Sequence, residues 1–261
     1  MGLIISSTIP RFKSLPFWQI VSVSEFRKGP IERRKVLIEG LLKKKDKLVV
    51  SGPSKIGKTR ILLDLAIAAV HNGKWFERFQ CHKSSVLYVG LELHDDDLDD
   101  RFEILASGMG RGIEGIDLLQ LRGQATAIEA MTELVTEKIE ERKSGYDLLI
   151  LDPIYKTLGD YDENKTGDVN KLMEGLEKIA QANNTSVVFA HHFSKGNKSD
   201  VQSGDRSSGS GVFLREPDAS IELVPKDPSK PDSRIDVHIK LRGFASIEVG
   251  VCGGTGLPHR S

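Results

Sequence analysis

Short apolar runs alternate with amphipathic stretches along most of the chain. Between the runs, helical patterns cover about residues 58–71, 95–107, 125–143 and 168–182, and apolar residues of the third recur at helical spacing. This alternation predicts an α/β fold with a mainly parallel sheet and helices on both of its faces. The runs are almost continuously apolar, as strands buried on both faces are. They span residues 47–52, 85–90, 116–121, 146–151 and 186–191.

Both ends of the chain depart from this pattern. Residues 1–45 are rich in proline and basic residues, and we interpret them as an irregular arm leading into the domain. Near the other end, apolar and polar residues alternate between turn residues, without a long helix. These runs predict antiparallel strands that extend the sheet, and they span residues 219–224, 234–243 and 245–250. The expected organisation is an arm over 1–35, one domain over 36–250 and a tail over 251–261.

Composition narrows the class of protein. The chain has 261 residues, 39% of them hydrophobic, with 37 basic and 37 acidic side chains. The length fits one large α/β domain or two small ones, and the composition is typical of a globular protein. The balanced charge argues against a chain whose whole surface binds nucleic acid, but it leaves room for a local basic patch. The two cysteines, Cys81 and Cys252, provide no disulfide framework and favour the cytoplasm. The longest apolar run, residues 61–70, is too short for a bilayer, so no membrane association is expected.

The stretch SGPSKIGKT, residues 51–59, contains a phosphate-binding loop pattern between a predicted strand and a predicted helix. Backbone N–H groups of such a loop surround phosphates, and the helix adds its positive N-terminal end. The Lys58 ammonium can reach the outer phosphates, and the Thr59 hydroxyl can bind Mg²⁺. The sequence therefore predicts binding of a nucleoside triphosphate with Mg²⁺. The predicted contacts are Gly52, Pro53, Ser54, Lys55, Ile56, Gly57, Lys58, Thr59 and Arg60.

A second Mg²⁺ contact is expected at the end of a buried strand. Asp152 follows the run 146–151 and precedes Pro153, which stops the strand. Asp147 opens the same run and would lie at its opposite end, so we interpret it as structural. The alternative for Asp152 is an acid in a simple turn at the strand end.

Six motifs in order resemble the RecA-like core of hexameric helicases, especially the plasmid RepA type and the replicative DnaB type, over roughly residues 36–250. The resemblance implies a RecA-like P-loop NTPase fold that hydrolyses ATP with Mg²⁺. It also implies a ring, expected to be a homohexamer, acting on single-stranded DNA. The motifs are the phosphate loop, VLYVGLEL (86–93), LLILDP (148–153), VVFAHHFSKG (187–196), DRSSGSGVFLREPDASIEL (205–223) and KLRG (240–243).

The resemblance assigns a catalytic role to one acidic residue of the stretch 91–102. In this family the second core strand is followed by a glutamate that polarises the attacking water, and Glu92 is the matching residue. The carboxylates at 95–97 fall in the first turn of the next helix, where negative charge suits the helix dipole. Asp99, Asp100 and Glu103 are expected on its wet face, with Leu98, Phe102 and Leu105 on its buried face. The alternative is a metal site built from these carboxylates.

Two histidines end the strand 186–191. Adjacent side chains of a strand point to opposite faces, so His191 and His192 cannot do the same work. The resemblance implies that His192 faces the nucleotide or the following loop, while His191 packs beneath. The alternative is a pair of structural histidines, and no third ligand indicates a metal site.

The family resemblance also gives roles to two groups of basic residues. The serine- and glycine-rich segment 194–210 carries Lys195, Lys198 and Arg206, which the resemblance places in a pore against the backbone of single-stranded DNA; the alternative is a surface loop without a partner. Lys240 and Arg242 alternate along a strand. The resemblance directs this pair into a neighbouring subunit's site, and the alternative is a basic strand face.

Three functions compete on this evidence. The first is a ring-forming, ATP-driven helicase that translocates on single-stranded DNA. The second is a RecA-like ATPase that acts as recombination mediator, loader or switch without separating strands. The third is a small-molecule kinase, which the late strands and the Lys240–Arg242 pair disfavour because a monomeric kinase would carry a lid.

Overall fold

The structure is a computed structural model, and it describes residues 20–28, 32–124, 127–163, 165–192, 209–227, 234–242 and 247–251. The chain divides into two units, Met1–Arg34 and Lys35–Ser261. In the first unit, helix α1 (Val23–Phe26) begins at a capping box in which Ser22 and Glu25 satisfy each other's backbone N–H groups. The predicted domain limits at residues 35 and 250 stay predictions.

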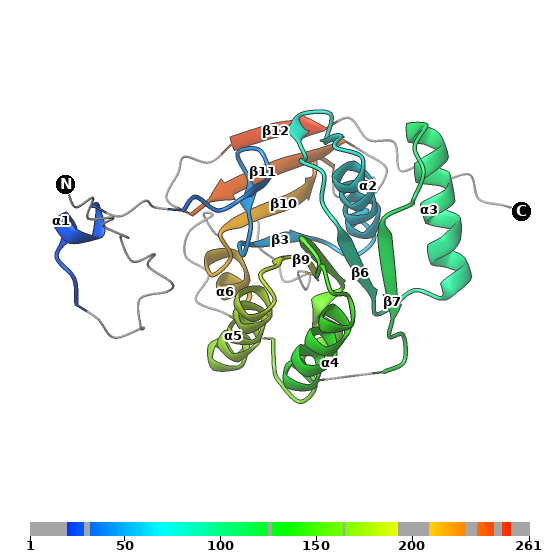
Figure 1. The fold of residues 1–261 in the computed structure, drawn as a ribbon. Coiled ribbons are helices and arrows are strands. Elements are labelled where there is room, and N and C mark those ends of the chain that lie inside the picture. Colours follow the sequence, from blue (N-terminus) through cyan, green and yellow to red (C-terminus); the bar gives the residue numbers. More distant parts are fainter. Residues whose placement is uncertain are drawn as a thin grey trace, which may run out of the picture. The chain divides into compact units, whose positions relative to one another are not determined.

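The second unit is built on one eight-stranded sheet with the order β12-β11-β10-β3-β9-β8-β6-β7 (Figure 1). The strands from β10 to β7 in this order run parallel, while β11 and β12 pair antiparallel. The predicted α/β class, with a mainly parallel sheet and antiparallel strands at its C-terminal end, is confirmed. The strands are β3 (Lys47–Gly52), β6 (Val86–Gly90), β7 (Ile116–Gln120), β8 (Leu148–Asp152), β9 (Ser186–His192), β10 (Ala219–Pro225), β11 (Ile235–Leu241) and β12 (Ile247–Val251).

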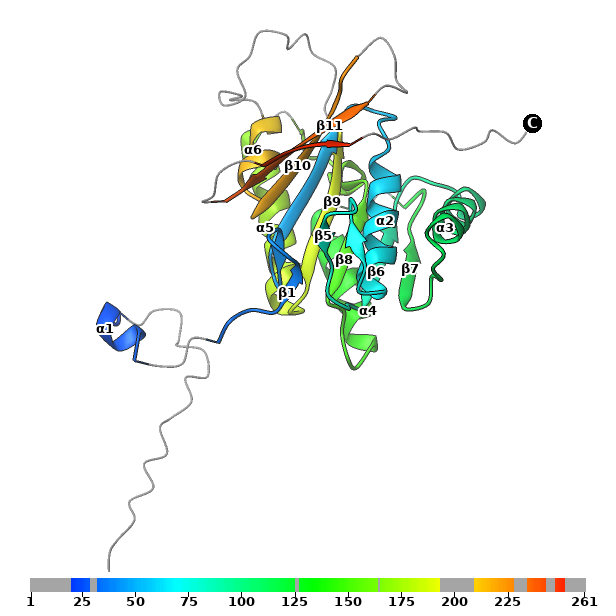
Figure 2. The same ribbon diagram turned by 90° about the horizontal axis from the view of Figure 1, so that it is seen from above.

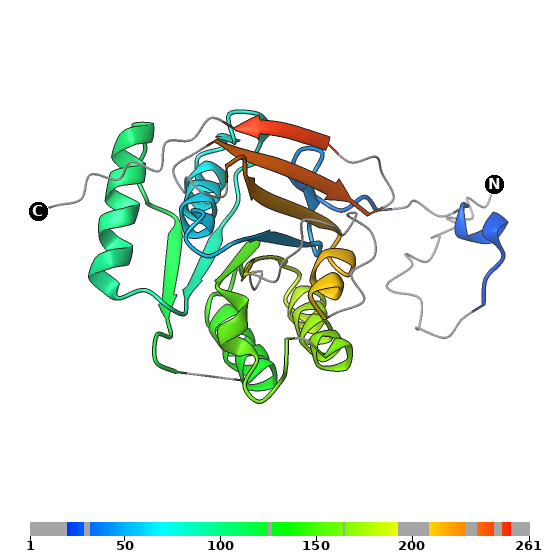
Figure 3. The same ribbon diagram turned by 180° about the vertical axis from the view of Figure 1, so that it is seen from behind.

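Helices cover both faces of the sheet (Figures 1 and 3). Alternate residues of β3, β6, β8 and β9 enter two apolar cores, one containing α2 and α3, the other α4, α5 and α6. This period of two is what a sheet covered on both faces requires. No helix in the described ranges is long and apolar enough to cross a membrane. The helices are α2 (Lys58–Val70), α3 (Asp95–Met109), α4 (Ile128–Glu141), α5 (Thr166–Ala182), α6 (Gly209–Arg215) and a 3₁₀ turn, η1 (Ile154–Thr157).

The interpretation of residues 1–45 as an irregular arm is wrong at its C-terminal end. Residues 36–43 form an antiparallel hairpin of β1 (Val36–Ile38) and β2 (Leu42–Lys43). Leu37 and Ile38 are buried, and Ile38 bridges to Cys81 beside a second hairpin, β4 (Lys74–Trp75) and β5 (Phe79–Gln80). Apolar burial therefore orders a stretch that was predicted to be irregular.

The prediction that residues 219–224 form an antiparallel strand holds for one neighbour of that strand and misses the other. Strand β10 pairs parallel with β3, in the register Ala219↔Leu48, and antiparallel only with β11. Helix α6 lies between β9 and β10 in the chain, and such a crossover connection returns the chain in its original direction. Figure 2 shows β10 and β11 side by side next to β3.

Candidate active site

Four sequence-predicted segments meet at one edge of the sheet, where parallel strands end. Gly52 pairs with His192, and Gly90 pairs with Asp152. The N–H of Leu91 extends this ladder by donating to the Asp152 carbonyl at 2.9 Å. Carboxyl edges of parallel sheets are where α/β proteins bind ligands. The structure therefore brings the phosphate loop, Asp152, the segment after Gly90 and His192 together.

The phosphate loop turns sharply from β3 into α2. Gly57 has φ +95°, a backbone conformation that L side chains rarely adopt, and an added Cβ would meet nothing within 4 Å. Gly52 is required for another reason, because its Cβ would lie 2.9 Å from the Leu223 carbonyl oxygen of β10. Glycine at these two positions thus lets the backbone turn and lets β3 and β10 approach.

Lys58 is buried at the start of α2. Its ammonium donates hydrogen bonds to the carbonyls of Gly52, at 2.8 Å, and Pro53, at 2.7 Å. Burial lowers the pKa of Lys58 to about 8, against the opposing charges of Asp152 and Glu92. The loop therefore holds a positive charge at neutral pH beside two carboxylates.

Asp152 is buried at the end of β8. The Tyr88 hydroxyl, from the middle of β6, donates to Asp152 Oδ2 at 2.7 Å. Burial raises the pKa of Asp152, and hydrogen bonds from Tyr88 and Thr59 oppose that rise. Hydroxyl and carboxylate oxygens are ligands that Mg²⁺ prefers, so Thr59 and Asp152 fit the ion that accompanies a nucleotide.

Glu92 lies two residues beyond β6, and its side chain is exposed. The Arg122 guanidinium, beyond the end of β7, donates to the Glu92 backbone carbonyl. Burial and the Glu92 carboxylate both raise the pKa of Tyr155, which lies in η1. Glu92 therefore has an exposed carboxylate close enough to act electrostatically on Lys58, Asp152 and Tyr155.

The acids that follow Glu92 lie on the exposed side of α3. Asp95, Asp96 and Asp97 occupy its first turn and are exposed, as are Asp99, Asp100 and Glu103, while Leu98 and Phe102 are buried and Leu105 is partly buried. Within the described residues, no three histidine, cysteine or carboxylate side chains lie close enough to share a metal ion. Of the two alternatives for this stretch, the described residues fit the exposed helix face.

The two histidines at the end of β9 point to opposite faces. His191 is buried and stacks on Phe213 of α6, with ring centroids 3.8 Å apart. Burial lowers the pKa of His191 to about 3, so the ring is neutral at physiological pH. His192 is half-buried and meets Tyr155 edge-on at 5.5 Å, and burial and the Lys58 charge lower its pKa.

The other predicted basic residues lie elsewhere. Lys240 pairs with Ser220, which pairs with Val49 of β3, and the Arg242 N–H donates to the Asp218 carbonyl before β10. Both therefore lie toward the edge where parallel strands begin, away from the phosphate loop of the same chain. Lys195, Lys198 and Arg206 fall outside the described residues.

The geometry also identifies residues that the sequence interpretation missed. Tyr88 counts as an apolar residue in a buried run, and only the pairing of β6 with β8 places its hydroxyl at Asp152. Tyr155 and Arg122 lie in short segments without a recognisable motif. Asp147, interpreted as structural, ion-pairs with Lys35 at 3.0 Å and with Lys44 at 2.5 Å at the opposite edge.

A strand–loop–helix phosphate site at the carboxyl edge of a mainly parallel sheet, with a buried acid beside the loop, defines a P-loop nucleoside triphosphatase. Residues 10–198, more than half of the chain, match a family model described as an AAA domain. The chain belongs to this AAA domain family, which supports ATP binding and ATP hydrolysis in general. No curated protein matches the chain.

Proposed function

We propose that the protein is a ring-forming, ATP-driven motor of the helicase type that moves along single-stranded DNA. The observation that carries this proposal is the attachment of the segment between β9 and α6 at both of its ends. It begins directly after His192, at the nucleotide edge, and it leads into Phe213, which stacks on His191. A change at the phosphate edge can therefore act on the segment that carries Lys195, Lys198 and Arg206.

The chemistry that we propose uses the charges at the carboxyl edge. The exposed Glu92 carboxylate accepts a proton from the water that attacks the terminal phosphate. Lys58 would bind the outer phosphates through its ammonium, and Thr59 and Asp152 would hold Mg²⁺, which would supply charge neutralisation for the phosphates. We propose that His192 responds to the loss of that charge, because it contacts Tyr155 and lies close enough to Lys58 for the ammonium to lower its pKa.

A second copy of the chain would complete the site. Lys240 and Arg242 lie toward the opposite edge of the sheet from their own phosphate loop, and we propose that they reach a neighbour's nucleotide. A guanidinium delivered in this way stabilises the charge that develops during phosphoryl transfer. We propose a homohexamer, in which repeated copies of residues 195, 198 and 206 would concentrate positive charge in a pore even though the chain is neutral.

One observation favours the second candidate, an ATPase that loads, mediates or switches without separating strands. In the described part of residues 35–251, no phenylalanine, tyrosine or tryptophan side chain is exposed. Proteins that bind single strands usually stack bases on exposed aromatic rings. Contact through backbone phosphates alone, as the motor requires, would be salt-sensitive and independent of sequence.

Turnover tests the chemistry. Glu92→Gln is expected to retain nucleotide binding and lose hydrolysis, and Arg242→Ala is expected to lose hydrolysis with nearly intact nucleotide affinity. Mixing the two exchanged proteins should restore some activity, because certain interfaces regain both groups. Mixtures without recovery, together with a monomer by light scattering in the presence of ATP, would contradict the ring.

Single-stranded DNA tests the motor. It should accelerate ATPase at low salt, and replacing Lys195, Lys198 and Arg206 by alanine should remove this acceleration while basal turnover remains. The matched control replaces three exposed lysines of the second unit with alanine, which removes the same amount of charge. This control should keep the acceleration. If single strands change neither rate nor assembly, the switch or mediator function replaces the motor. The control residues are Lys74, Lys143 and Lys178.

A further inference from the structure

The carboxyl ends of three neighbouring strands each bring one side chain to the nucleotide edge. In the sheet order β9-β8-β6, Tyr155 follows the middle strand, while His192 ends β9 and Glu92 follows β6. Gly90 and Asp152 pair at the ends of β6 and β8, so the two segments that follow leave the sheet side by side. Tyr155 therefore lies between the residue proposed to activate water and the residue proposed to respond to the phosphate.

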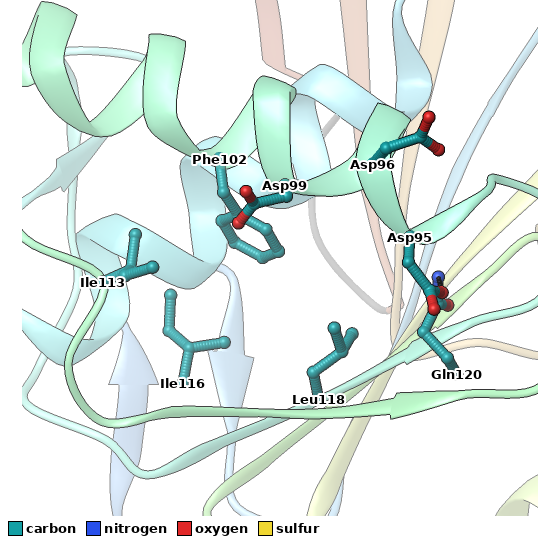
Figure 4. Close-up of a pocket in the computed structure, with 8 residues that line it drawn as sticks. All are labelled: Asp95, Asp96, Asp99, Phe102, Ile113, Ile116, Leu118 and Gln120. Atoms are coloured by element: carbon teal, nitrogen blue, oxygen red, sulfur yellow. Dashed lines mark hydrogen bonds between the residues drawn. The ribbon is translucent and has the colours of Figure 1, made fainter.

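The backbone around Glu92 is held from the side of β7. The Arg122 guanidinium donates to the Glu92 carbonyl. The Gln120 amide donates to the Leu93 carbonyl at 3.4 Å and to Asp95 at 3.0 Å, and Figure 4 shows this amide beside the start of α3. The Glu92 side chain itself is exposed, and no ion pair between described residues includes it. These contacts therefore fix the backbone, while the rotatable bonds of the side chain need a separate contact.

Tyr155 supplies a contact to that side chain from the side of β8. Its hydroxyl donates a hydrogen bond to the Glu92 carboxylate. Burial and the Glu92 charge raise the pKa of Tyr155 above its usual range, so the hydroxyl stays protonated at neutral pH and can donate. Because a carboxylate has two oxygens, one can accept from Tyr155 while the other accepts from water.

The ring of Tyr155 is itself held in place. The His192 ring meets it edge-on, with centroids 5.5 Å apart, and Lys156 Nζ lies 4.9 Å from its centroid. The 3₁₀ turn is anchored by Ile154 and Thr157, both fully buried, and the Thr157 hydroxyl donates to the Ile154 carbonyl at 2.8 Å. A side chain that is fixed by its own neighbours can orient a reacting group.

We propose that Tyr155 is a positioning residue for ATP hydrolysis, whose hydroxyl holds the Glu92 carboxylate toward the attacking water. This inference rests on the proposed function, in which Glu92 accepts the proton of that water. An exposed carboxylate without such a hold would spend much of its time in other rotamers. A misplacement of about 1 Å can cost about 100-fold in rate, so the hydrogen bond has a measurable consequence.

Tyr155→Phe tests the proposal, because it removes the hydroxyl and retains the ring that meets His192. We expect kcat to fall by roughly 10- to 100-fold. The KM and the affinity for ATP should change little, since the carboxylate acts on water rather than on the nucleotide. Tyr161→Phe is the matched control, because the Tyr161 hydroxyl donates to the Glu129 carboxylate of α4, outside the nucleotide edge. The control should keep the wild-type kcat.

A double-mutant cycle separates positioning from a structural role. Glu92→Asp shortens the side chain, so that its carboxylate no longer reaches the Tyr155 hydroxyl but can still accept a proton. Adding Tyr155→Phe to this protein should then lower kcat little further, because the two residues act through one contact.

The outcomes separate this inference from the proposed function. A wild-type kcat in Tyr155→Phe, when Glu92→Gln has lost turnover, overturns the inference and leaves the role of Glu92 standing. A wild-type kcat in Glu92→Gln overturns both. A loss of ATP affinity in Tyr155→Phe, an equal loss of kcat in the Tyr161→Phe control, or an equal further loss in the Glu92→Asp protein also overturns the inference, because Tyr155 would then support the fold rather than the carboxylate.

Discussion

The Tyr88 hydroxyl offers the sharpest test of how the Mg²⁺ ligand is held. It donates to Asp152 Oδ2 at 2.7 Å, and both residues are buried. Tyr88→Phe removes this donor while retaining the ring that packs edge-on against Phe102, with centroids 5.7 Å apart. The substitution therefore isolates one hydrogen bond to a buried carboxylate.

The expected magnitude follows from that hydrogen bond. A hydrogen bond to a charged group contributes about 1.5–3 kcal/mol, and loss of a group that orients a metal ligand typically costs about 10- to 100-fold in metal affinity or activity. We expect the Mg²⁺ concentration for half-maximal ATPase to rise by about that factor. The hydrogen bond also holds the Asp152 pKa down against burial. Without it the pKa rises further, so the acid limb of the ATPase profile should move to higher pH, where the carboxylate is still ionised.

The assay is steady-state ATPase at saturating ATP over a series of free Mg²⁺ concentrations. Tyr146→Phe is the matched control, because the Tyr146 hydroxyl donates to Asp117 Oδ2, also at 2.7 Å, near the opposite edge of the sheet. This control should leave the Mg²⁺ midpoint unchanged. A Tyr88→Phe protein with a wild-type Mg²⁺ midpoint and a wild-type acid limb would refute the role of Tyr88.

Three further predictions follow from the site. Because the pKa of Lys58 is about 8 and phosphate binding requires its charged form, nucleotide affinity should fall by up to about tenfold per pH unit above pH 8; Lys58→Arg, measured by the same titration, should lose this dependence. Gly52→Ala should lower the free energy of unfolding by about 1–3 kcal/mol in urea denaturation, because its Cβ would collide with the Leu223 carbonyl. Arg122→Ala should reduce kcat by up to about 100-fold with little change in KM, because Arg122 positions the Glu92 backbone; an unchanged kcat would contradict this.

Periodicity predicted most of the fold because each core strand carries its own signal. The runs at 47–52 and 186–191 are buried on both faces, and their apolar composition alone requires this. The direction of a strand relative to its neighbours cannot be predicted in this way, because it depends on the connection between the strands. Alternation identified residues 219–224 as a strand, but the short helix α6 before it decides that β10 runs parallel to β3.

In the candidate site, too, some residues could be predicted from the sequence and others could not. The phosphate loop and Asp152 were predictable because each joins a recognisable local pattern to the end of a buried strand. Tyr88 and Tyr155 were not, since their contacts arise from strand register and from a 3₁₀ turn. The hairpin over residues 36–43 was missed because Val36, Leu37 and Ile38 form too short an apolar run to outweigh the basic residues on either side of the hairpin.

The position of β3 between β9 and β10 has a consequence for biosynthesis. The strand that carries the phosphate loop pairs with residues 187–192 and 219–222, which lie about 140 and 170 positions downstream. At about 5–20 residues per second, a ribosome needs roughly 10–35 s between making β3 and making its second neighbour. Until then one edge of β3 stays unpaired, because β9, which is made earlier, covers only the other edge. Nascent chains that end before residue 219 should therefore not be retained on immobilised nucleotide, and binding should appear only after β10 has left the ribosome.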